Sequence, residues 1–365
     1  MTTAERLLLG PGPSPVSPRV MRALSQPVLS HLDPQMLTIL DDIRGQLARV
    51  FGAGTDSLSI AVSGTGTSGM ETAVANLAQE GTRAVVVVNG YFGDRIARIF
   101  ESYGARVTRV TAEWGRAIDP AAVERAIASS PCDVLAVVHA ETSTGVLNPV
   151  EDVVKLAADA GALSVVDAVT SLGGMPLDVQ QWGLDVCYSC TQKGLGAPAG
   201  LAPITFSSRA RQRRVACRSF YLDIALLEDY WLGRKYHHTI SAPLVFALHE
   251  ALAGVEEEGL QARYARHHAN HLALVTGLEG LGLDLLPPRG ERLWTLNAVR
   301  VPADIDEALV RRQLLEQFNI EIGAGLGPLA GRIWRVGLMG SGSATENVTL
   351  FLNALERTLA AAGHR

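Results

Sequence analysis

The sequence has little cysteine, no long apolar run and no leader-like start. Four cysteines among 365 residues are too few for the dense disulfide network of a small secreted protein, so we expect reduced, buried thiols. No uninterrupted apolar stretch approaches the roughly 20 residues that span a bilayer. Residues 1–9 lack both the cationic start and the apolar stretch of a secretory signal peptide. These absences exclude a membrane partner and predict a cytoplasmic protein.

An excess of either charge is also missing. The 32 basic and 37 acidic side chains leave a formal net charge of -5, which gives no overall attraction to nucleic acid or to an anionic membrane. Hydrophobic residues reach 47% and charged residues only 19%, which excludes disorder as the main state. We therefore expect small molecules, or a second copy of the chain, as partners.

The length exceeds what one compact core usually holds, so we expect more than one domain. Four prolines and two glycines between positions 10 and 18 interrupt any helix, which predicts an extended N-terminal arm over residues 1–20. We predict a large domain over residues 21–258 and a small α+β domain over residues 259–365. The boundary follows a helical stretch that ends in three glutamates and Gly259.

Short β-branched runs alternate with amphipathic stretches from Ser57 onward. This alternation is typical of an α/β protein with a mainly parallel sheet covered on both faces. The predicted strands of the large domain are 58–63, 84–89, 133–139, 164–167 and 185–189. In the small domain we predict helices over 260–281, over 304–318 and from 344, with extended segments over 294–301 and near residues 320 and 334.

A glycine-rich turn, Gly64-Thr65-Gly66-Thr67-Ser68-Gly69, follows the first of these strands and precedes a helical run. Backbone amides at such a helix start can bind a phosphate. A dinucleotide site also needs an acid at the end of the next strand, but that strand ends in Asn89 and Gly90. The turn therefore favours a phosphate group, and a turn without any ligand is the alternative.

Lys193 and Asp167 are the strongest candidates for chemistry. Lys193 follows an apolar strand and has small neighbours, and a buried lysine with a lowered pKa is a nucleophile toward carbonyls and pyridoxal phosphate. Asp167 ends a buried strand, where a parallel sheet binds ligands, and an aspartate there can keep a pyridine nitrogen protonated. The alternatives are a surface lysine in a loop and an aspartate that caps the next helix.

Arg335 lies between apolar residues of a predicted strand in the small domain. A buried guanidinium needs an anion, and its planar fork matches the carboxylate of a substrate. The alternative is a structural ion pair with an acid such as Glu321.

Three other groups favour structural roles. Cys187 and Cys190 form a C-x-x-C pair inside or beside a strand, so strand packing is preferred to redox or metal chemistry. His267 and His271 share a helix face but have no third ligand, so we expect a solvated polar face and no metal site. The basic cluster between residues 209 and 218 lacks interleaved aromatics and predicts an exposed surface.

Taken together, these motifs resemble those of one family, the class V, fold-type I pyridoxal-phosphate aminotransferases, and within it the alanine–glyoxylate and serine–glyoxylate/pyruvate branch. The resemblance covers nearly the whole chain. It is carried by Leu9-Gly10-Pro11-Gly12-Pro13, Ser63-Gly64-Thr65-Gly66-Thr67, Asn89-Gly90-Tyr91-Phe92-Gly93, His139-Ala140-Glu141-Thr142-Ser143-Thr144-Gly145-Val146, Val166-Asp167-Ala168-Val169-Thr170-Ser171-Leu172-Gly173-Gly174, Gln192-Lys193, Tyr236-His237-His238-Thr239 and Trp334-Arg335-Val336-Gly337-Leu338-Met339-Gly340.

The resemblance implies a seven-stranded, mainly parallel sheet and a role for each matching residue. Lys193 would form a Schiff base with pyridoxal 5'-phosphate, and Asp167 would pair with the pyridine nitrogen. Arg335 would bind the substrate carboxylate. The remaining implied residues are Gly66, Thr67 and Gln192 at the phosphate, Thr142 at the phenolic side of the ring, Phe92 stacked on the ring, Gly12 in the substrate wall, and Tyr236 and Thr239 reaching the phosphate of the neighbouring subunit.

Phe92 and Thr67 depart from the family pattern, which often has tryptophan and histidine at these positions. We expect these departures to change cofactor affinity and not the type of reaction. The implied enzyme is a homodimer that transfers the amino group of alanine or serine to glyoxylate or pyruvate, because extended backbone at Gly10–Pro13 leaves room only for a small side chain.

Three alternatives remain open. A ureidoglycine–glyoxylate aminotransferase resembles this chain too, but such enzymes tend to have asparagine where Tyr236 stands. A cysteine desulfurase or other lyase would need a reactive cysteine late in the chain, and none follows Cys217. A nicotinamide-dependent oxidoreductase would explain the glycine-rich turn but would leave Lys193, Asp167 and Arg335 without roles.

Overall fold

The fold is a two-lobed α/β structure, described over residues 5–363 by a computed structural model. The first four residues of the predicted arm lie outside the described residues. The larger lobe contains a seven-stranded sheet with the strand order β2-β10-β9-β8-β5-β3-β4. Its strands are β2 (Leu58–Gly64), β3 (Arg83–Val88), β4 (Arg106–Thr111), β5 (Val134–Val138), β8 (Leu163–Asp167), β9 (Val186–Tyr188) and β10 (Gly200–Phe206).

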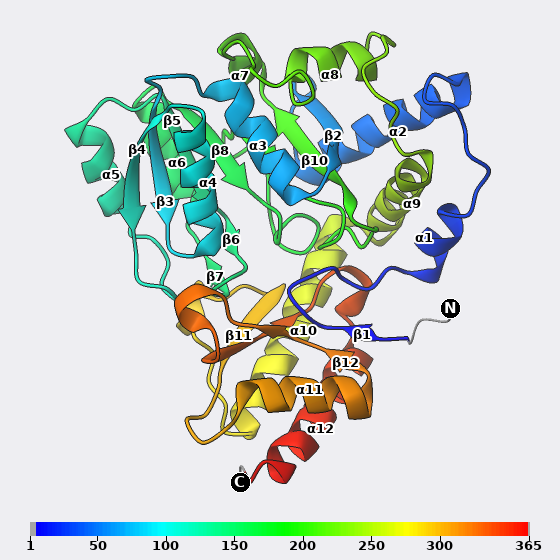
Figure 1. Cartoon of the computed structure of the whole chain (residues 1–365), viewed down its shortest axis with the longest axis vertical. Helices are drawn as coiled ribbons and strands as arrows, with labels where there is room; N and C mark the ends of the chain where they lie inside the picture. The colour runs from blue at the N-terminus through cyan, green and yellow to red at the C-terminus, as the bar shows by residue number, and fades with distance from the viewer. Residues whose placement is uncertain (1–4, 364–365) are drawn as a thin grey trace.

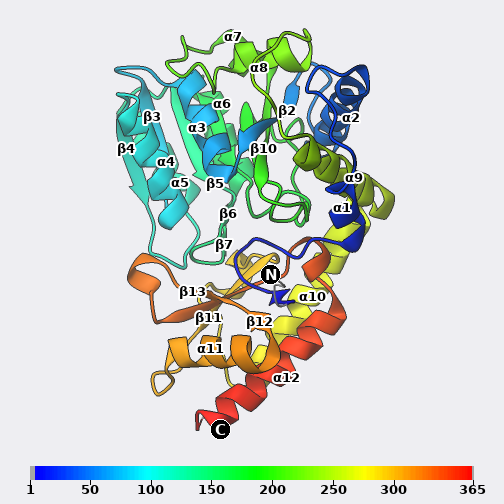
Figure 2. The ribbon, with the colours of Figure 1, turned by 45° about the vertical axis from the view of Figure 1, so that its right-hand side comes forward.

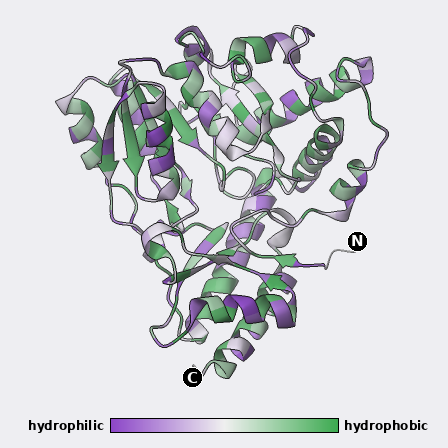
Figure 3. Ribbon diagram, in the orientation of Figure 1, coloured by the Kyte–Doolittle hydropathy of each residue, from purple (hydrophilic) through white to green (hydrophobic). Residues whose placement is uncertain are grey.

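The sheet is mainly parallel, as predicted. Only β10 runs against its neighbours, because it pairs antiparallel with both β2 and β9. The strands β3, β5, β8 and β9 pair in parallel, and every residue of β5 and β8 is buried. Figure 3 shows these strands largely in hydrophobic colours between helices of mixed colour. Burial on both faces explains why continuous apolar runs, without polar alternation, predicted these strands.

Helices cover both faces of the sheet. Helices α3 (Gly66–Leu77) and α4 (Tyr91–Ser102) contact each other and pack on the sheet, whereas α5 (Pro120–Ser129) and α6 (Val150–Asp159) form a separate contacting pair. The other helices of this lobe are α2 (Pro34–Phe51), α7 (Ser208–Gln212), α8 (Ile224–Trp231) and α9 (Ala242–Glu258). Two short strands, β6 (Ala140–Glu141) and β7 (Val146–Leu147), form a hairpin at the edge nearest the smaller lobe (Figure 1).

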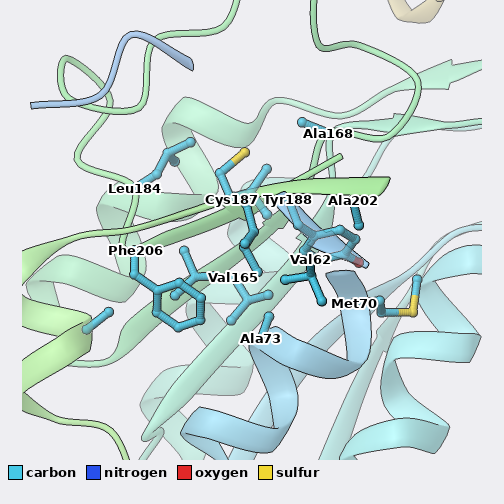
Figure 4. Packing of buried hydrophobic residues seen from close by; sticks show 14 of the residues in the cluster. Val62, Met70, Ala73, Val165, Ala168, Leu184, Cys187, Tyr188, Ala202 and Phe206 are labelled. Atoms are coloured by element: carbon cyan, nitrogen blue, oxygen red, sulfur yellow. The ribbon is translucent and has the colours of Figure 1, made fainter. Parts of the chain in front are cut away.

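The core beneath α3 shows how the larger lobe is held together. In Figure 4, Met70 and Ala73 of α3 lie over side chains from β2, β8, β9 and β10. Val62, Val165, Cys187 and Ala202 are each no more than 1% exposed and belong to one continuous hydrophobic cluster. This packing fixes the start of α3 relative to the ends of the strands.

The smaller lobe has its own hydrophobic cluster, which includes Leu274, Leu314, Trp334 and Phe351. Its three-stranded sheet has the order β11-β14-β13. The elements of this lobe are α10 (Leu260–Gly280), β11 (Leu296–Arg300), α11 (Glu307–Phe318), β12 (Ile320–Glu321), β13 (Gly323–Ala324), β14 (Ile333–Gly337) and α12 (Thr345–Ala361), with single 3-10 turns at Arg289–Glu291, Gly327–Leu329 and Gly340–Gly342. The separate cluster supports a division near residue 258, which stays a prediction.

The arm is more structured than an extended segment. Strand β1 (Leu7–Leu8) pairs in parallel with β12, and Leu9 is fully buried in the cluster of the smaller lobe. Figures 1 and 2 both place β1 beside that lobe. Helix α1 (Pro18–Ala23) already begins inside the predicted arm, because the Ser17 side chain caps it and Pro18 occupies its first turn. The backbone is therefore extended at β1, but the arm does not stay extended to residue 20, because residues 18–20 already belong to α1.

Within residues 5–363, no helix combines the length and the apolar character that crossing a bilayer requires.

Candidate active site

A pocket lies at the carboxyl ends of five parallel strands. Residues that follow β2, β3, β5, β8 and β9 line it, as expected for a ligand site of an open α/β sheet. Seven predicted site residues meet there: Gly66, Thr67, Phe92, Thr142, Asp167, Gln192 and Lys193. Sequence reasoning missed Arg95, which also lines the pocket.

Asp167 is the buried acid of the pocket. Its Oδ1 accepts a hydrogen bond from the Val169 backbone N–H at 2.8 Å, and its Oδ2 accepts one from the Tyr188 hydroxyl at 2.9 Å. Burial raises the pKa of Asp167 to about 7, although these hydrogen bonds oppose the rise. The carboxylate is therefore held in place but gains its charge readily only beside a cation. The segment after Asp167 forms turns, so the alternative of a helix cap does not hold.

Lys193 lies in the same pocket, in the turn that follows β9. Its Nζ donates a hydrogen bond to the Pro11 carbonyl oxygen. Burial lowers the pKa of Lys193, and the positive charge of Arg335 lowers it further. The alternative of a surface lysine is therefore wrong. Gly12 has φ +110, and a Cβ placed there would overlap the lysine side chain, so this position needs glycine both for its backbone and for its space.

The arm holds the backbone of the lysine turn as well. The Ser14 N–H donates to the Gln192 carbonyl oxygen at 2.9 Å, and the Ser14 hydroxyl donates to the Lys193 carbonyl oxygen at 2.8 Å. Because β1 anchors the same arm to the smaller lobe, the arm connects the lysine turn to that lobe.

One end of the pocket is suited to an anion. Helix α3 begins at Gly66, its N-cap residue Thr65 makes no side-chain cap, and uncapped N–H groups at a helix start attract negative charge. A Cβ at Gly66 would come within 3.0 Å of Val169. The buried Gln192 Oε1 has no hydrogen-bond partner, so this amide is incomplete in the protein alone.

Arg95 brings a positive charge to that end. Its guanidinium donates to the Thr67 hydroxyl at 3.0 Å and lies 5.0 Å from the centre of the Phe92 ring. Arg95 forms no ion pair with any described residue, since the neighbouring Asp94 pairs with Arg98 and Arg109 instead. Its spacing of three residues from Phe92 on α4 was the only available sequence signal, because a helix places such positions on one face.

Phe92 is positioned by a buried acid. The Glu141 carboxylate accepts hydrogen bonds from the Phe92 N–H at 3.2 Å, the Gly93 N–H at 3.1 Å and the Ser143 hydroxyl at 2.6 Å. It thereby supplies the acceptor that the first turn of α4 lacks. Burial raises the pKa of Glu141, and these hydrogen bonds oppose the rise.

Arg335 belongs to the edge of the site that the smaller lobe supplies. Its Nε donates to the Ala324 carbonyl oxygen at 2.6 Å, and a long contact of 3.5 Å joins its guanidinium to the Thr142 carbonyl oxygen. Burial lowers the pKa of Arg335 to about 10, so it remains charged at neutral pH. Glu321 forms no ion pair with it in the described part of the chain, so the structural alternative does not hold.

Tyr236 and Thr239 do not reach this pocket. Both lie in the segment between α8 and α9, and the Tyr236 side chain is 64% exposed. The structure thus places them away from the other predicted site residues of the same chain.

The expectation for the two histidines needs correction. His267 and His271 do not form a solvated face, because they are 0% and 4% exposed. The histidines lie on the buried side of helix α10, where His267 is next to Gly174 and the His271 Nδ1 is hydrogen-bonded to the Asn297 Oδ1 at 2.7 Å. Burial lowers the pKa of His267 to about 3 and of His271 to about 4, which keeps both neutral. In residues 5–363 no cluster of His, Cys, Asp and Glu side chains is suited to a metal ion.

The cysteines and the basic cluster are partly as expected. All four cysteines are free, but Cys132 and Cys217 are half-buried and not buried. Cys190 lines the pocket, in addition to following its strand. Within the basic cluster, Arg209 and Arg211 form ion pairs with Asp185 and Glu228.

Comparison of the sequence with known proteins identifies the family of this chain. The sequence model of the family described as Aminotransferase class-V matches residues 7–331. This chain belongs to the class-V aminotransferase family. An alanine–glyoxylate aminotransferase of Drosophila melanogaster is 36% identical over 364 residues, which cover 97% of this chain and 92% of that protein.

Solved structures agree with the sequence comparison. The alanine–glyoxylate aminotransferase of Nostoc sp. has a TM-score of 0.96 at 43% identity, covering 98% of this chain and 96% of that one. The ureidoglycine–glyoxylate aminotransferase of Bacillus subtilis has a TM-score of 0.97 at 36% identity, covering 100% and 95%. This class-V aminotransferase is therefore a transaminase with the fold predicted from its sequence.

Proposed function

We propose that this class-V aminotransferase binds pyridoxal 5'-phosphate and transfers the amino group of alanine or serine to glyoxylate or pyruvate. The observation that carries the proposal is that Lys193 and Asp167 line one pocket and that Arg335 lies at its edge, in contact with the Thr142 carbonyl oxygen and near enough for its charge to lower the pKa of Lys193. The matching relatives support the same donor and acceptor classes.

The side chains of the pocket fit this cofactor. Asp167 would face the ring nitrogen, Phe92 would cover the ring, and Thr142 would contact its phenolic side. The start of α3 at Gly66 and Thr67, with Gln192 and Arg95, would hold the phosphate. When bound, the cofactor supplies a conjugated ring that accepts electrons from the substrate α-carbon. A cationic ring nitrogen would also favour the ionised form of Asp167, whose pKa burial raises to about 7.

Lys193 would act twice. Its lowered pKa favours the neutral amine, which is the nucleophilic form that attaches to an aldehyde. When a substrate amine stands in its place, the Lys193 Nζ would be the base that holds the proton taken from the substrate α-carbon. Both roles need a basic amine in a place that excludes water, and the buried pocket provides one.

Arg335 would bind the α-carboxylate of the substrate. Its guanidinium keeps its positive charge and has only neutral carbonyl acceptors in the protein alone. Two parallel hydrogen bonds to a carboxylate would fix the substrate relative to Lys193 and so supply the orientation that catalysis needs. The wall around Pro11 and Gly12 lies directly against the lysine, which favours a methyl or hydroxymethyl side chain.

Ureidoglycine is the second candidate donor, because the Bacillus subtilis relative acts on it. Tyr236 favours alanine or serine, as argued from the sequence. A panel of alanine, serine and ureidoglycine as donors against glyoxylate and pyruvate, scored by kcat/KM, separates these possibilities. The proposal predicts the highest value for alanine or serine, and a preference for ureidoglycine would overturn this choice of donor.

The active form is proposed to be a homodimer. Tyr236 is exposed in the single chain beside other exposed aromatic residues, Phe220 at 70% and Tyr221 at 43%, and exposed apolar clusters mark interaction surfaces. In a dimer, Tyr236 and Thr239 would reach the phosphate site of the partner. Light scattering should give twice the mass of one chain. The location in the cytoplasm stays a prediction from the sequence.

A further inference from the structure

Three charged side chains lie where the two lobes join. Glu258 is the last residue of α9, and Arg263 and Arg266 lie on the first two turns of α10. The Glu258 carboxylate accepts hydrogen bonds from Arg263 at 2.6 Å and from the Arg266 Nε at 2.6 Å. We call these three residues the junction cluster.

The arginines of the junction cluster donate hydrogen bonds to the backbone segments that hold the proposed reacting residues. Arg263 donates to the Gly194 carbonyl oxygen at 2.6 Å and to the Gly173 carbonyl oxygen at 2.7 Å. Gly194 directly follows Lys193, and Gly173 lies in the turns that follow Asp167. One guanidinium therefore connects the lysine segment to the aspartate segment.

Arg266 connects the third segment. It donates to the Gly340 carbonyl oxygen at 3.2 Å and to the Ser343 carbonyl oxygen. This loop follows β14, the strand that carries Arg335. The loop also packs against the lysine turn, because a Cβ at Gly340 would lie 3.1 Å from the Gly196 Cα and 3.4 Å from the Lys193 carbonyl oxygen.

The cluster depends on its single acid. Arg263 is 7% exposed, and burial lowers its pKa while Glu258 opposes this effect. The carbonyl oxygens accept hydrogen bonds from the arginines, but among the described residues only Glu258 forms ion pairs with them. Removing that charge would leave two close guanidinium groups, one of them buried, without a counter-ion. We expect the arginines to separate and the segments they hold to shift.

We propose that Glu258, Arg263 and Arg266 form a positioning device that sets the places of Lys193, Asp167 and Arg335 relative to one another across the lobe junction. None of the three lines the pocket, so they act through backbone carbonyls and are not catalytic residues. The inference rests on the proposed function, because it assigns the device to the three residues of that reaction. It predicts that disrupting the junction cluster lowers kcat by more than any loss of folding stability explains.

The adjacent acid offers a matched control. Glu257 also forms an ion pair with an arginine, Arg19, but that pair joins α9 to α1 and is exposed. Glu258→Gln and Glu257→Gln therefore make the same chemical change at neighbouring positions of one helix end. Only the first removes the counter-ion of the junction cluster.

The test compares both variants with the wild-type holoenzyme. We would measure kcat and KM, the melting temperature, and the pH midpoint of the cofactor absorbance change, which reports the surroundings of Lys193. Misplacing reacting groups by about 1 Å can lower rates by about 100-fold. Glu258→Gln should lower kcat roughly 10- to 100-fold and shift the pH midpoint, whereas Glu257→Gln should leave both unchanged. Equal kcat values and equal midpoints in the two variants would overturn the proposal.

Arg266→Ala covers the case in which Glu258→Gln fails to fold. Arg266 is half-exposed and lines a cavity of about 180 Å³ beside Glu258 and Arg263, so free guanidinium ion can reach the vacated place. Arg266→Ala should lose kcat, and added guanidinium should restore part of it without changing the wild type. An unchanged kcat, or a loss that guanidinium does not relieve, would contradict the positioning role. If the wild-type protein did not transfer the amino group of alanine or serine to glyoxylate or pyruvate, the proposed function would be contradicted instead.

Discussion

Two parts of the pocket differ in how many of their contacts a single chain supplies. We call the part around Asp167 and Lys193 the floor, and the part around Thr67, Arg95 and Gln192 the open end. At the floor, Asp167 is 2% exposed and both of its carboxylate oxygens have fixed protein donors. At the open end, Thr67 is exposed, Arg95 is half-buried, the Gln192 Oε1 has no partner among the described residues, and Tyr236 lies outside the pocket. The contrast indicates that one chain holds the reacting groups of the floor in fixed positions. Cofactor affinity depends instead on the groups of the open end, which are held less firmly.

Lys193→Ala should have the largest effect. Without an amine at this position, turnover should be abolished, while cofactor still binds noncovalently through the rest of the pocket. Steady-state assays and the cofactor absorbance after gel filtration check both parts. Full activity of this variant would exclude the proposed catalytic role of Lys193.

Asp167→Asn should lower kcat on the order of 1,000-fold and weaken cofactor binding. An amide keeps the shape of the carboxylate but cannot hold the ring nitrogen protonated, so the preorganised charge is lost. Single-turnover rates with alanine provide the measurement. Unchanged kinetics would show that the carboxylate does not tune the ring.

Arg335→Ala should cost about 2–5 kcal/mol in kcat/KM for the amino acid, since it removes the partner of a desolvated carboxylate. Cofactor affinity should not change, which distinguishes this residue from those that hold the ring. A negligible change in kcat/KM would assign Arg335 to structure.

Asp167 should also give the cofactor-free protein a pH-dependent stability. Burial raises its pKa to about 7 in the folded state from 3.8, so the folded state binds the proton more tightly. Its contribution is complete below about pH 4 and is lost as the pH rises through 7. Asp167→Asn should therefore gain stability over the wild type, by up to a few kcal/mol, between pH 4 and pH 8. Urea unfolding of both proteins without cofactor measures it, and parallel pH curves would refute the shift.

Arg95→Gln should have the smallest effect and should appear only at the open end. We expect roughly a 3- to 10-fold weaker affinity for pyridoxal phosphate, as expected for one partly exposed charge, and no change for pyridoxal, which lacks the phosphate. Arg98→Gln is the matched control, because Arg98 lies on the same helix but pairs with Asp94. Equal losses for the two vitamers would place Arg95 elsewhere than at the phosphate.

The sequence predicted the floor better than its surroundings, and the reason is physical. Buried parallel strands are continuous apolar runs, so their ends, and with them Asp167 and Lys193, could be located. The pairing of β1 with β12 joins residues more than 300 positions apart, and no local pattern carries such a contact. Arg95 was missed, and His267 was wrongly expected to be solvated, for the same reason, because their surroundings come from other elements.

Borohydride reduction of the cofactor-loaded protein tests the central claim most directly. Reduction fixes any covalent link between an amine and the cofactor aldehyde, and peptide mass analysis then locates the link. The account predicts a mass increase of one reduced cofactor on the peptide that contains Lys193, and none on that peptide in Lys193→Ala. An unmodified Lys193 peptide, or a label on another lysine in the active wild-type enzyme, would contradict it.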